Sequence, residues 1–340
     1  MPILRLGAAL LLGLWTSLAS AGVHPVTDQA GRIVQVPWAP QRVFPVITMM
    51  TPVMAALAPE QMTGLAFRLA PGAEPFLPPR LASLPVVPVL EGLNGEAILA
   101  MQPDLAIGWA GSGSLLQQTE SLLQRLRIPL LLYAGERLAD YPATFRALGQ
   151  VLGRAARGEQ LARELEDSQQ QPARALQGLA HADRPRVYYA ESPDGLTSQC
   201  SQSSRVEVVW LAGGRPVPEC ADGGLTSHQT FSFERLLVLD PDVILARSPV
   251  IAARLRRDSR WQRLRAVREQ RVYGAPGLPF NWVDRPPSFM RALGARWLAR
   301  QLHPARFSGD FRPEVQQFLQ TFFAVTPSAA MLTALLEPGQ

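Results

Sequence analysis

The 340-residue chain contains no lysine, two cysteines and four histidines. All 33 basic side chains are therefore arginines, and with 28 acidic residues the net charge is +5. A nucleic-acid binder gathers its cations on one surface, but here acidic residues are interspersed with them. Even the densest stretch, residues 254–271, carries Asp258 and Glu269. We therefore expect a solvated helical face in this stretch and no nucleic-acid partner.

Cys200 and Cys220 match neither a redox motif nor a zinc motif. They form no C-x-x-C pair, and no histidine or further cysteine stands at ligand spacing from either. In an oxidising compartment the expected outcome is a disulfide between them. A bare metal ion would need several His, Asp or Glu side chains in one place, and four histidines offer little for such a cage.

Long hydrophobic runs are also missing, except for a short one near the N-terminus. Arg5 precedes the apolar residues 6–15, and Ala19-Ser20-Ala21 follows them. This order is typical of a cleavable signal peptide, and the apolar run is too short to span a bilayer. No cysteine follows the run to carry a lipid. We expect residues 1–21 to be removed and the mature chain to be exported without a membrane anchor.

One phrase occurs twice, about 140 residues apart. Residues 96–107 read EAILAMQPDLAI, and residues 234–245 read ERLLVLDPDVIL. Each copy predicts a short helix, a Pro-Asp turn and a buried strand, since the residue before a proline is driven out of the helical region. Two copies of one such unit predict an α/β fold with two similar lobes and a ligand cleft between them.

The remaining pattern predicts where each lobe begins and ends. Alternating helices and strands place an N-terminal α/β lobe over residues 22–157 and a C-terminal α/β lobe over residues 182–305. Helical periodicity over residues 158–181 predicts one long helix joining them, with Pro172 as an expected kink. Residues 306–340 are predicted to be a helical tail. Thr51 is expected to cap a helix with Pro52 at its first position, so that residues 48–50 lie in the preceding loop.

With these features in order, the chain resembles the periplasmic substrate-binding proteins of metal-chelate ABC importers, the helical-backbone class that serves iron-siderophores, haem and cobalamin. The resemblance rests on the opening hairpin VTDQAGR at residues 26–32, the two Glu…Pro-Asp units and the long helix between the lobes. It implies a periplasmic receptor with no cofactor of its own.

 We accordingly expect a monomer without enzymatic activity. Its expected partners are the permease and the ATPase of an ABC importer, and its expected cargo is a metal chelate.

The resemblance also implies a role for the two glutamates that open the repeated phrase. In this family one acidic residue per lobe docks onto arginines of the permease, and Glu96 and Glu234 occupy those positions. An exposed carboxylate in the first turn of a helix is favoured by the helix dipole and can pair with arginine through two hydrogen bonds. The alternative is that both are ordinary acidic residues at helix N-termini.

In a two-lobe α/β binder the ligand contacts come from loops at the carboxyl ends of the strands. These loops supply the predicted ligand-binding residues, which are Met49, Met50, Phe67, Trp109, Tyr189, His228, Trp282 and Arg285. The methionines and aromatic residues have core packing as their alternative. His228 is either a solvated loop residue or an axial ligand to a bound metal. Arg285 either pairs with Asp284 or binds an anionic group of the ligand.

Three hypotheses for function follow. The first is a periplasmic receptor for an iron-siderophore, haem or corrinoid chelate. The second is a receptor of the same fold for a bare metal ion or an oxyanion such as molybdate, held by Arg285 and loop amides. The third is an exported hydrolase, which the sequence disfavours because it contains neither G-x-S-x-G nor H-E-x-x-H.

Overall fold

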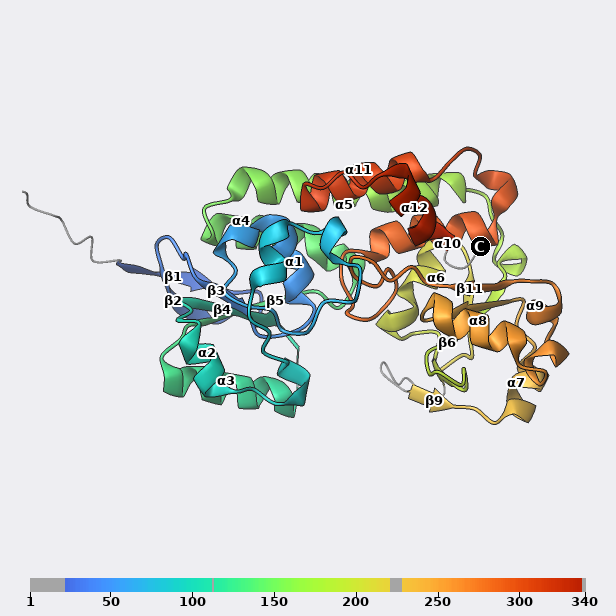
Figure 1. Cartoon of the computed structure of the whole chain (residues 1–340), viewed down its shortest axis with the longest axis horizontal. Coiled ribbons are helices and arrows are strands. Elements are labelled where there is room, and N and C mark those ends of the chain that lie inside the picture. Colours follow the sequence, from blue (N-terminus) through green and yellow to red (C-terminus); the bar gives the residue numbers. More distant parts are fainter. Residues whose placement is uncertain (1–21, 112, 221–227, 338–340) are drawn as a thin grey trace, which may run out of the picture.

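The computed structural model describes residues 22–111, 113–220 and 228–337. Two α/β lobes lie side by side, and helix α5 (Ala155–Ala175) runs along one side of both (Figure 1). The predicted signal peptide lies outside the described residues. None of the described helices combines the length and the apolar character needed to cross a membrane.

The N-terminal lobe is built on a three-stranded parallel sheet in the order β3-β4-β5. Its strands are apolar on both faces because helices cover both sides, as is usual in parallel sheets. A separate antiparallel hairpin, β1-β2, precedes the sheet. The elements of this lobe are β1 (Val23–Thr27), β2 (Ile33–Pro37), β3 (Val43–Pro45), α1 (Met50–Leu57), α2 (Gly95–Ala100), β4 (Leu105–Trp109), α3 (Ser114–Leu126), β5 (Leu130–Tyr133) and α4 (Tyr141–Val151).

The connecting helix starts earlier and stops earlier than its sequence pattern predicts. Gly153, with a left-handed φ of 66°, separates α4 from α5, which then extends from Ala155 to Ala175 rather than over residues 158–181. Pro172 lies inside the last turn of the helix. Gly158 lets α5 approach α4 closely, since a Cβ there would lie 2.4 Å from the carbonyl oxygen of Phe145. The helix is thus packed firmly onto the first lobe.

The C-terminal lobe contains a four-stranded parallel sheet in the order β11-β10-β6-β8 and a small antiparallel pair, β7-β9. A disulfide joins Cys200 and Cys220, as predicted, with 4.8 Å between their Cα atoms. The elements of this lobe are β6 (Arg186–Ala190), β7 (Thr197–Gln199), α6 (Glu207–Leu211), β8 (Arg215–Val217), β9 (His228–Thr230), α7 (Phe233–Leu239), β10 (Val243–Ala246), α8 (Pro249–Arg257), α9 (Arg265–Arg268), β11 (Val272–Gly274) and α10 (Arg291–Leu302).

The C-terminal segment returns to the first lobe. It forms α11 (Arg312–Phe323) and α12 (Ala329–Leu336), and α11 lies alongside α5 and contacts α1 (Figure 1). Arg157 of α5 donates to the carbonyl oxygens of Thr321 and Phe322 at 2.6 and 3.1 Å, where α11 ends. Phe322 also stacks on Phe289, which precedes α10. The chain therefore connects the lobes through α11 as well as through α5.

Candidate ligand-binding cleft

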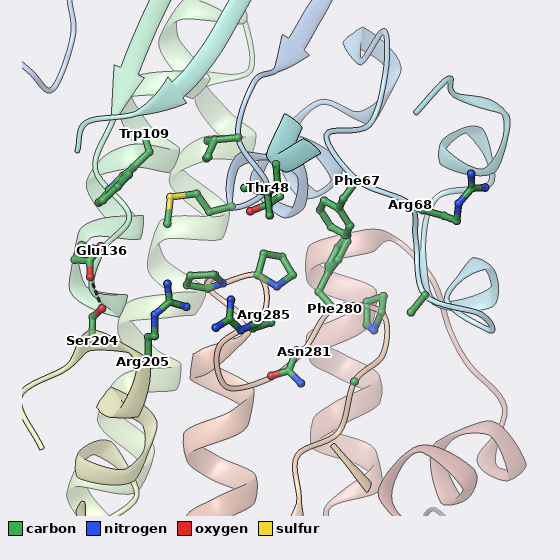
Figure 2. A pocket seen from close by; sticks show the side chains of 18 residues that line it. Thr48, Phe67, Arg68, Trp109, Glu136, Ser204, Arg205, Phe280, Asn281 and Arg285 are labelled. Atoms are coloured by element: carbon green, nitrogen blue, oxygen red, sulfur yellow. Dashed lines mark hydrogen bonds between the residues drawn. The ribbon is translucent and has the colours of Figure 1, made fainter. Parts of the chain in front are cut away.

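A cavity of about 490 Å³ lies between the two lobes. Figure 2 shows lining side chains of both lobes around one space, with Arg68 at the rim pointing away from it. Its volume falls in the range of small-molecule sites, which are mostly apolar with a few placed polar groups. The lining residues are Ile47, Thr48, Met49, Phe67, Arg68, Ala70, Leu90, Trp109 and Glu136 from the N-terminal lobe, and Ser204, Arg205, Gly277, Pro279, Phe280, Asn281, Arg285, Pro286 and Pro287 from the C-terminal lobe.

The wall formed by the N-terminal lobe is built where its parallel strands end. Residues 47–49 follow β3, Trp109 is the last residue of β4, and Glu136 follows β5. The carboxyl ends of parallel strands meet at one edge of a sheet, and ligands of open α/β sheets bind outside that edge. This lobe therefore offers mainly apolar surface, together with the carboxylate of Glu136 and, at the rim, the guanidinium of Arg68.

The opposite wall is formed by the loop between β11 and α10. Phe280 of this loop meets Phe67 of the first lobe edge to face, with ring centroids 6.2 Å apart (Figure 2). Asn281 holds the loop in place, because its amide donates to the carbonyl oxygen of Arg247 at 2.9 Å and its oxygen accepts from two amides of the loop. An aromatic contact between the lobes thus forms one side of the cavity.

Arg205 and Arg285 place two guanidinium groups on this wall, above two buried carboxylates. Arg205 donates to Asp284 at 2.8 Å, and Arg285 donates to Glu191 while lying 3.7 Å from Asp284. The arginine side chains are 32 and 42% exposed, whereas Asp284 is 0% and Glu191 3% exposed. Gln199 also donates to Glu191, at 2.6 Å. The carboxylates therefore fix the arginines from below and leave their outer edges free for a ligand.

The charges of this cluster are strongly coupled. Burial raises the pKa of Asp284, although the neighbouring Arg205 and Arg285 lower it. Burial lowers the pKa of Arg285, but the hydrogen bond with Glu191 and the charge of Asp284 outweigh that effect, so its pKa is raised. The guanidinium groups of Arg205 and Arg285 can donate hydrogen bonds to an acidic group of a ligand.

The two lobes are joined directly at the edge of the cavity. Ser204 donates a short hydrogen bond to the carboxylate of Glu136 (Figure 2). Behind them Arg291, which is 1% exposed, donates to the carbonyl oxygens of Gly135 and Glu136 and to the carboxylate of Glu207 at 2.7 Å. Glu207 belongs to the C-terminal lobe, so one buried guanidinium contacts backbone of one lobe and a carboxylate of the other.

Four of the predicted ligand-binding residues lie together in this cavity. They are Met49, Phe67, Trp109 and Arg285. The geometry of Arg285 is compatible with both of its predicted roles, because it forms ion pairs within the protein and also lines the cavity. The loops named by sequence also contribute Thr48, Arg68, Leu90, Phe280 and Asn281 to the lining.

Three predicted residues lie in the hydrophobic core instead. Helix α1 begins at Met50, before the expected cap Thr51, so Met50 is turned inward and fully buried. Tyr189 is buried because both faces of the β6 sheet are covered, and its hydroxyl lies 3.5 Å from Asp284, behind the arginines. Trp282 is fully buried, with its indole donating to Leu278 at 2.9 Å. We therefore remove these three from the set of direct ligand contacts.

For His228 the structure describes the backbone, and the side chain lies outside the described part of the chain. It begins strand β9 and pairs with Gln199 of β7. Its predicted role as a metal ligand stays a prediction. Among the described residues, no group of three or more His, Cys, Asp or Glu side chains is arranged to hold a metal ion.

Sequence reasoning missed Glu136, Ser204 and Arg205. Glu136 follows strand β5, so the rule that places ligand contacts after parallel strands could have found it. Ser204 and Arg205 lie between β7 and α6, shortly after the disulfide-bonded Cys200. No periodic pattern marks that segment, and only the tertiary structure brings it to the cavity.

The two glutamates of the repeated phrase lie at equivalent places. Glu96 is in the first turn of α2, capped by Asn94, and Glu234 is in the first turn of α7, capped by Ser232. Both side chains are exposed. In Figure 1 α2 and α7 lie on the same side of the two lobes, away from α5. Their geometry permits contact with one extended partner surface.

Comparison with known proteins agrees with this architecture. Residues 72–278 match the family model described as periplasmic binding protein, and the chain belongs to this family. Its members are transport substrate-binding proteins rather than enzymes, work with the permease and ATPase of ABC transporters, and carry no cofactor of their own.

Individual relatives differ in what their names say they bind. The chain is 25% identical to the molybdate-binding protein MolA of Haemophilus influenzae over 73% of this chain and 74% of the relative. It is 23% identical to a vitamin B12-binding protein of Vibrio parahaemolyticus, over 64 and 75%. An ABC transporter solute binding protein from Sulfurospirillum deleyianum has a similar structure, with a TM-score of 0.83, 31% identity, and coverage of 92% of this chain and 99% of that one.

Proposed function

We propose that this protein is the periplasmic receptor of an ABC importer and that its cargo is an organic metal chelate of the siderophore, haem or corrinoid type. The observation that carries the proposal is the cavity between the lobes, about 490 Å³ in volume and lined largely by apolar side chains. An organic chelate presents apolar surface that such walls can bury, and burial contributes about 25 cal/mol per Å². An acidic group of the chelate would accept hydrogen bonds from Arg205 and Arg285.

An oxyanion such as molybdate is the second candidate. It is favoured by the name of the Haemophilus influenzae relative and by the arginines in the cavity. A small, strongly hydrated oxyanion needs a closely fitting set of donors to replace its water. The apolar surface of Trp109, Phe67 and Phe280 offers no such set of hydrogen-bond donors that could replace the water around an oxyanion. For this reason we place the chelate first.

Binding measurements separate these candidates. Titration of the purified protein with haemin, cyanocobalamin, a ferric siderophore and molybdate can be followed by intrinsic tryptophan fluorescence and by calorimetry. We expect binding of at least one chelate, which Trp109→Ala weakens. Tight binding of molybdate alone, with none of any chelate, would establish the second candidate and exclude the first.

The remaining parts of the proposal concern transport. Residues 1–21 act as a signal peptide that is cleaved after Ala21, so that the mature receptor resides in the periplasm as a monomer. Glu96 and Glu234 dock onto arginines of the permease, one from each lobe. Their exposure on one side of the molecule and their equivalent positions in the repeated unit support this role.

A further inference from the structure

The arginines of the cavity are balanced by acidic side chains, and this balance limits the charge of the ligand. Three cations line the cavity, Arg68, Arg205 and Arg285, which alone would suggest a polyanionic ligand. Two of them, however, already face a buried carboxylate. Asp284 accepts from Arg205 at 2.8 Å, and Glu191 accepts from Arg285.

Asp284 lies between the two arginines. One of its oxygens accepts from Arg205, and the other is 3.7 Å from Arg285. Glu191 contacts Arg285 from the other side and also accepts from Gln199. Both carboxylates are almost completely buried, so water screens these contacts only weakly. The negative charges of Asp284 and Glu191 therefore neutralise much of the positive potential that the two arginines would otherwise create in the cavity.

The other two charges of the cavity lie far apart. Glu136 faces Ser204 beside Arg205, whereas Arg68 points outward at the opposite rim (Figure 2). Arg68 is exposed and forms no ion pair with any residue in the described ranges. Glu136 is the one carboxylate among the lining residues. The three guanidinium groups are thus equalled in number by three carboxylates, those of Asp284, Glu191 and Glu136, in the lining or directly beneath it.

We infer that the receptor selects a chelate whose net charge is close to zero, and that Asp284 and Glu191 are specificity-determining residues that exclude polyanions. This inference rests on the proposed function and narrows its substrate class. A localised acidic group can still bind the outer edges of the two arginines, because directional hydrogen bonds survive charge neutralisation. A compact polyanion would gain little attraction there and would lose its hydration.

The test compares ligands of different charge on the full mature chain. Cyanocobalamin serves as the net-neutral chelate, a ferric tricatecholate as the trianionic chelate and molybdate as a small dianion. We expect the wild-type protein to prefer the neutral chelate, with an affinity that changes little between low and high salt. Tighter binding of either anion, with a steep loss in salt, would overturn the inference while leaving a receptor function intact.

Variants test the two buried carboxylates directly. Asp284→Asn should raise the affinity for the ferric tricatecholate about tenfold while changing that for cyanocobalamin much less. Glu191→Gln is a second variant with the same expected direction. Asp258→Asn is the matched control, since it removes a carboxylate paired with Arg260 at 2.9 Å on the surface of the same lobe.

The pattern across ligands separates selectivity from folding. If Asp284 and Glu191 only maintained the structure, their variants would lose affinity for every probe alike, and the inference would be wrong. If neither of the two chelates nor molybdate bound to the wild-type protein, the proposed function itself would be refuted, and the inference that rests on it would be refuted as well.

Discussion

Arg291 and Glu207 form a buried ion pair, 2.7 Å long, at the junction of the two lobes. The same guanidinium donates to backbone carbonyls of the first lobe, and the same carboxylate accepts from the amide of Leu138 at 2.9 Å. Burial raises the pKa of Glu207, while the charge of Arg291 opposes that rise. The pair therefore fixes the position of one lobe relative to the other beside the cavity.

The first prediction concerns this junction. Arg291→Met removes the ion-pair partner of the largely buried Glu207 and the guanidinium that donates to the carbonyl oxygens of Gly135 and Glu136. We expect a loss of about 3–5 kcal/mol in the free energy of unfolding, measured by urea denaturation. Arg163→Met removes a highly exposed partner of Glu159 and should cost less than about 1 kcal/mol. Equal effects of the two variants would contradict this assignment.

A second prediction contrasts two tryptophans. Trp109 lines the cavity and is partly exposed, whereas Trp282 is fully buried. Trp109→Ala should weaken chelate binding with a small effect on stability. Trp282→Ala should cost about 3–5 kcal/mol of stability, because it leaves a large void in the core. Calorimetric titration and urea denaturation of both variants test the contrast, which would fail if Trp109→Ala left the affinity unchanged.

The third prediction concerns the disulfide. It closes a loop between residues 20 apart in sequence, and in the chain-entropy model such a loop contributes about 3 kcal/mol. Replacing Cys200 and Cys220 by serine should lower the free energy of unfolding by about that amount. It should also weaken ligand binding, since Ser204 and Arg205 follow closely after Cys200. Adding a reductant to the wild-type protein serves as the matching experiment, and an unchanged urea midpoint there would refute the prediction.

A fourth prediction tests permease docking. Glu96→Arg and Glu234→Arg should each strongly reduce uptake and the stimulation of the transporter ATPase, because like charges would then face one another. The dissociation constant for the ligand should not change. Glu269→Arg reverses another exposed carboxylate of the C-terminal lobe and should leave uptake intact. A loss of ligand affinity in the first two variants would argue against docking.

The fifth prediction is that Glu159 makes the stability of the folded protein depend on pH. The side-chain hydrogen bond from Arg146 of α4, joined by one from Arg163, lowers the pKa of Glu159 in α5 from 4.5 to about 2. A lowered carboxyl pKa stabilises the folded state above the ordinary pKa, and this contribution is lost as the pH falls from 4.5 towards about 2.

Glu159→Gln should therefore be less stable than the wild-type protein near neutral pH, and the difference should vanish as the pH approaches about 2. Urea midpoints measured across this range provide the test. Glu164→Gln is the control in the same helix, since Glu164 forms no ion pair with any other described residue. A difference that persists in acid would mean that Glu159 acts through packing rather than charge.

Much of the fold was predictable from local pattern. The two Glu…Pro-Asp units form a helix, a turn and a buried strand in each lobe, since apolar periodicity and proline geometry act within a few residues. The limits of α5 were predicted less well: packing against α4 at Gly158 and the turn at Gly153 set its start. The return of α11 to the first lobe has no signal in the sequence.

For the cleft, the predicted order of strands and loops was enough to place Met49, Phe67, Trp109 and Arg285 at the cavity. Packing between distant segments set which side chains of those loops point outward, and it turned Met50 and Trp282 into the core. Folding also paired Arg205 with Asp284 and Arg285 with Glu191, which are distant from each other in sequence. The position of a loop follows from the local order of strands, whereas burial and charge pairing depend on contacts between segments far apart in the chain.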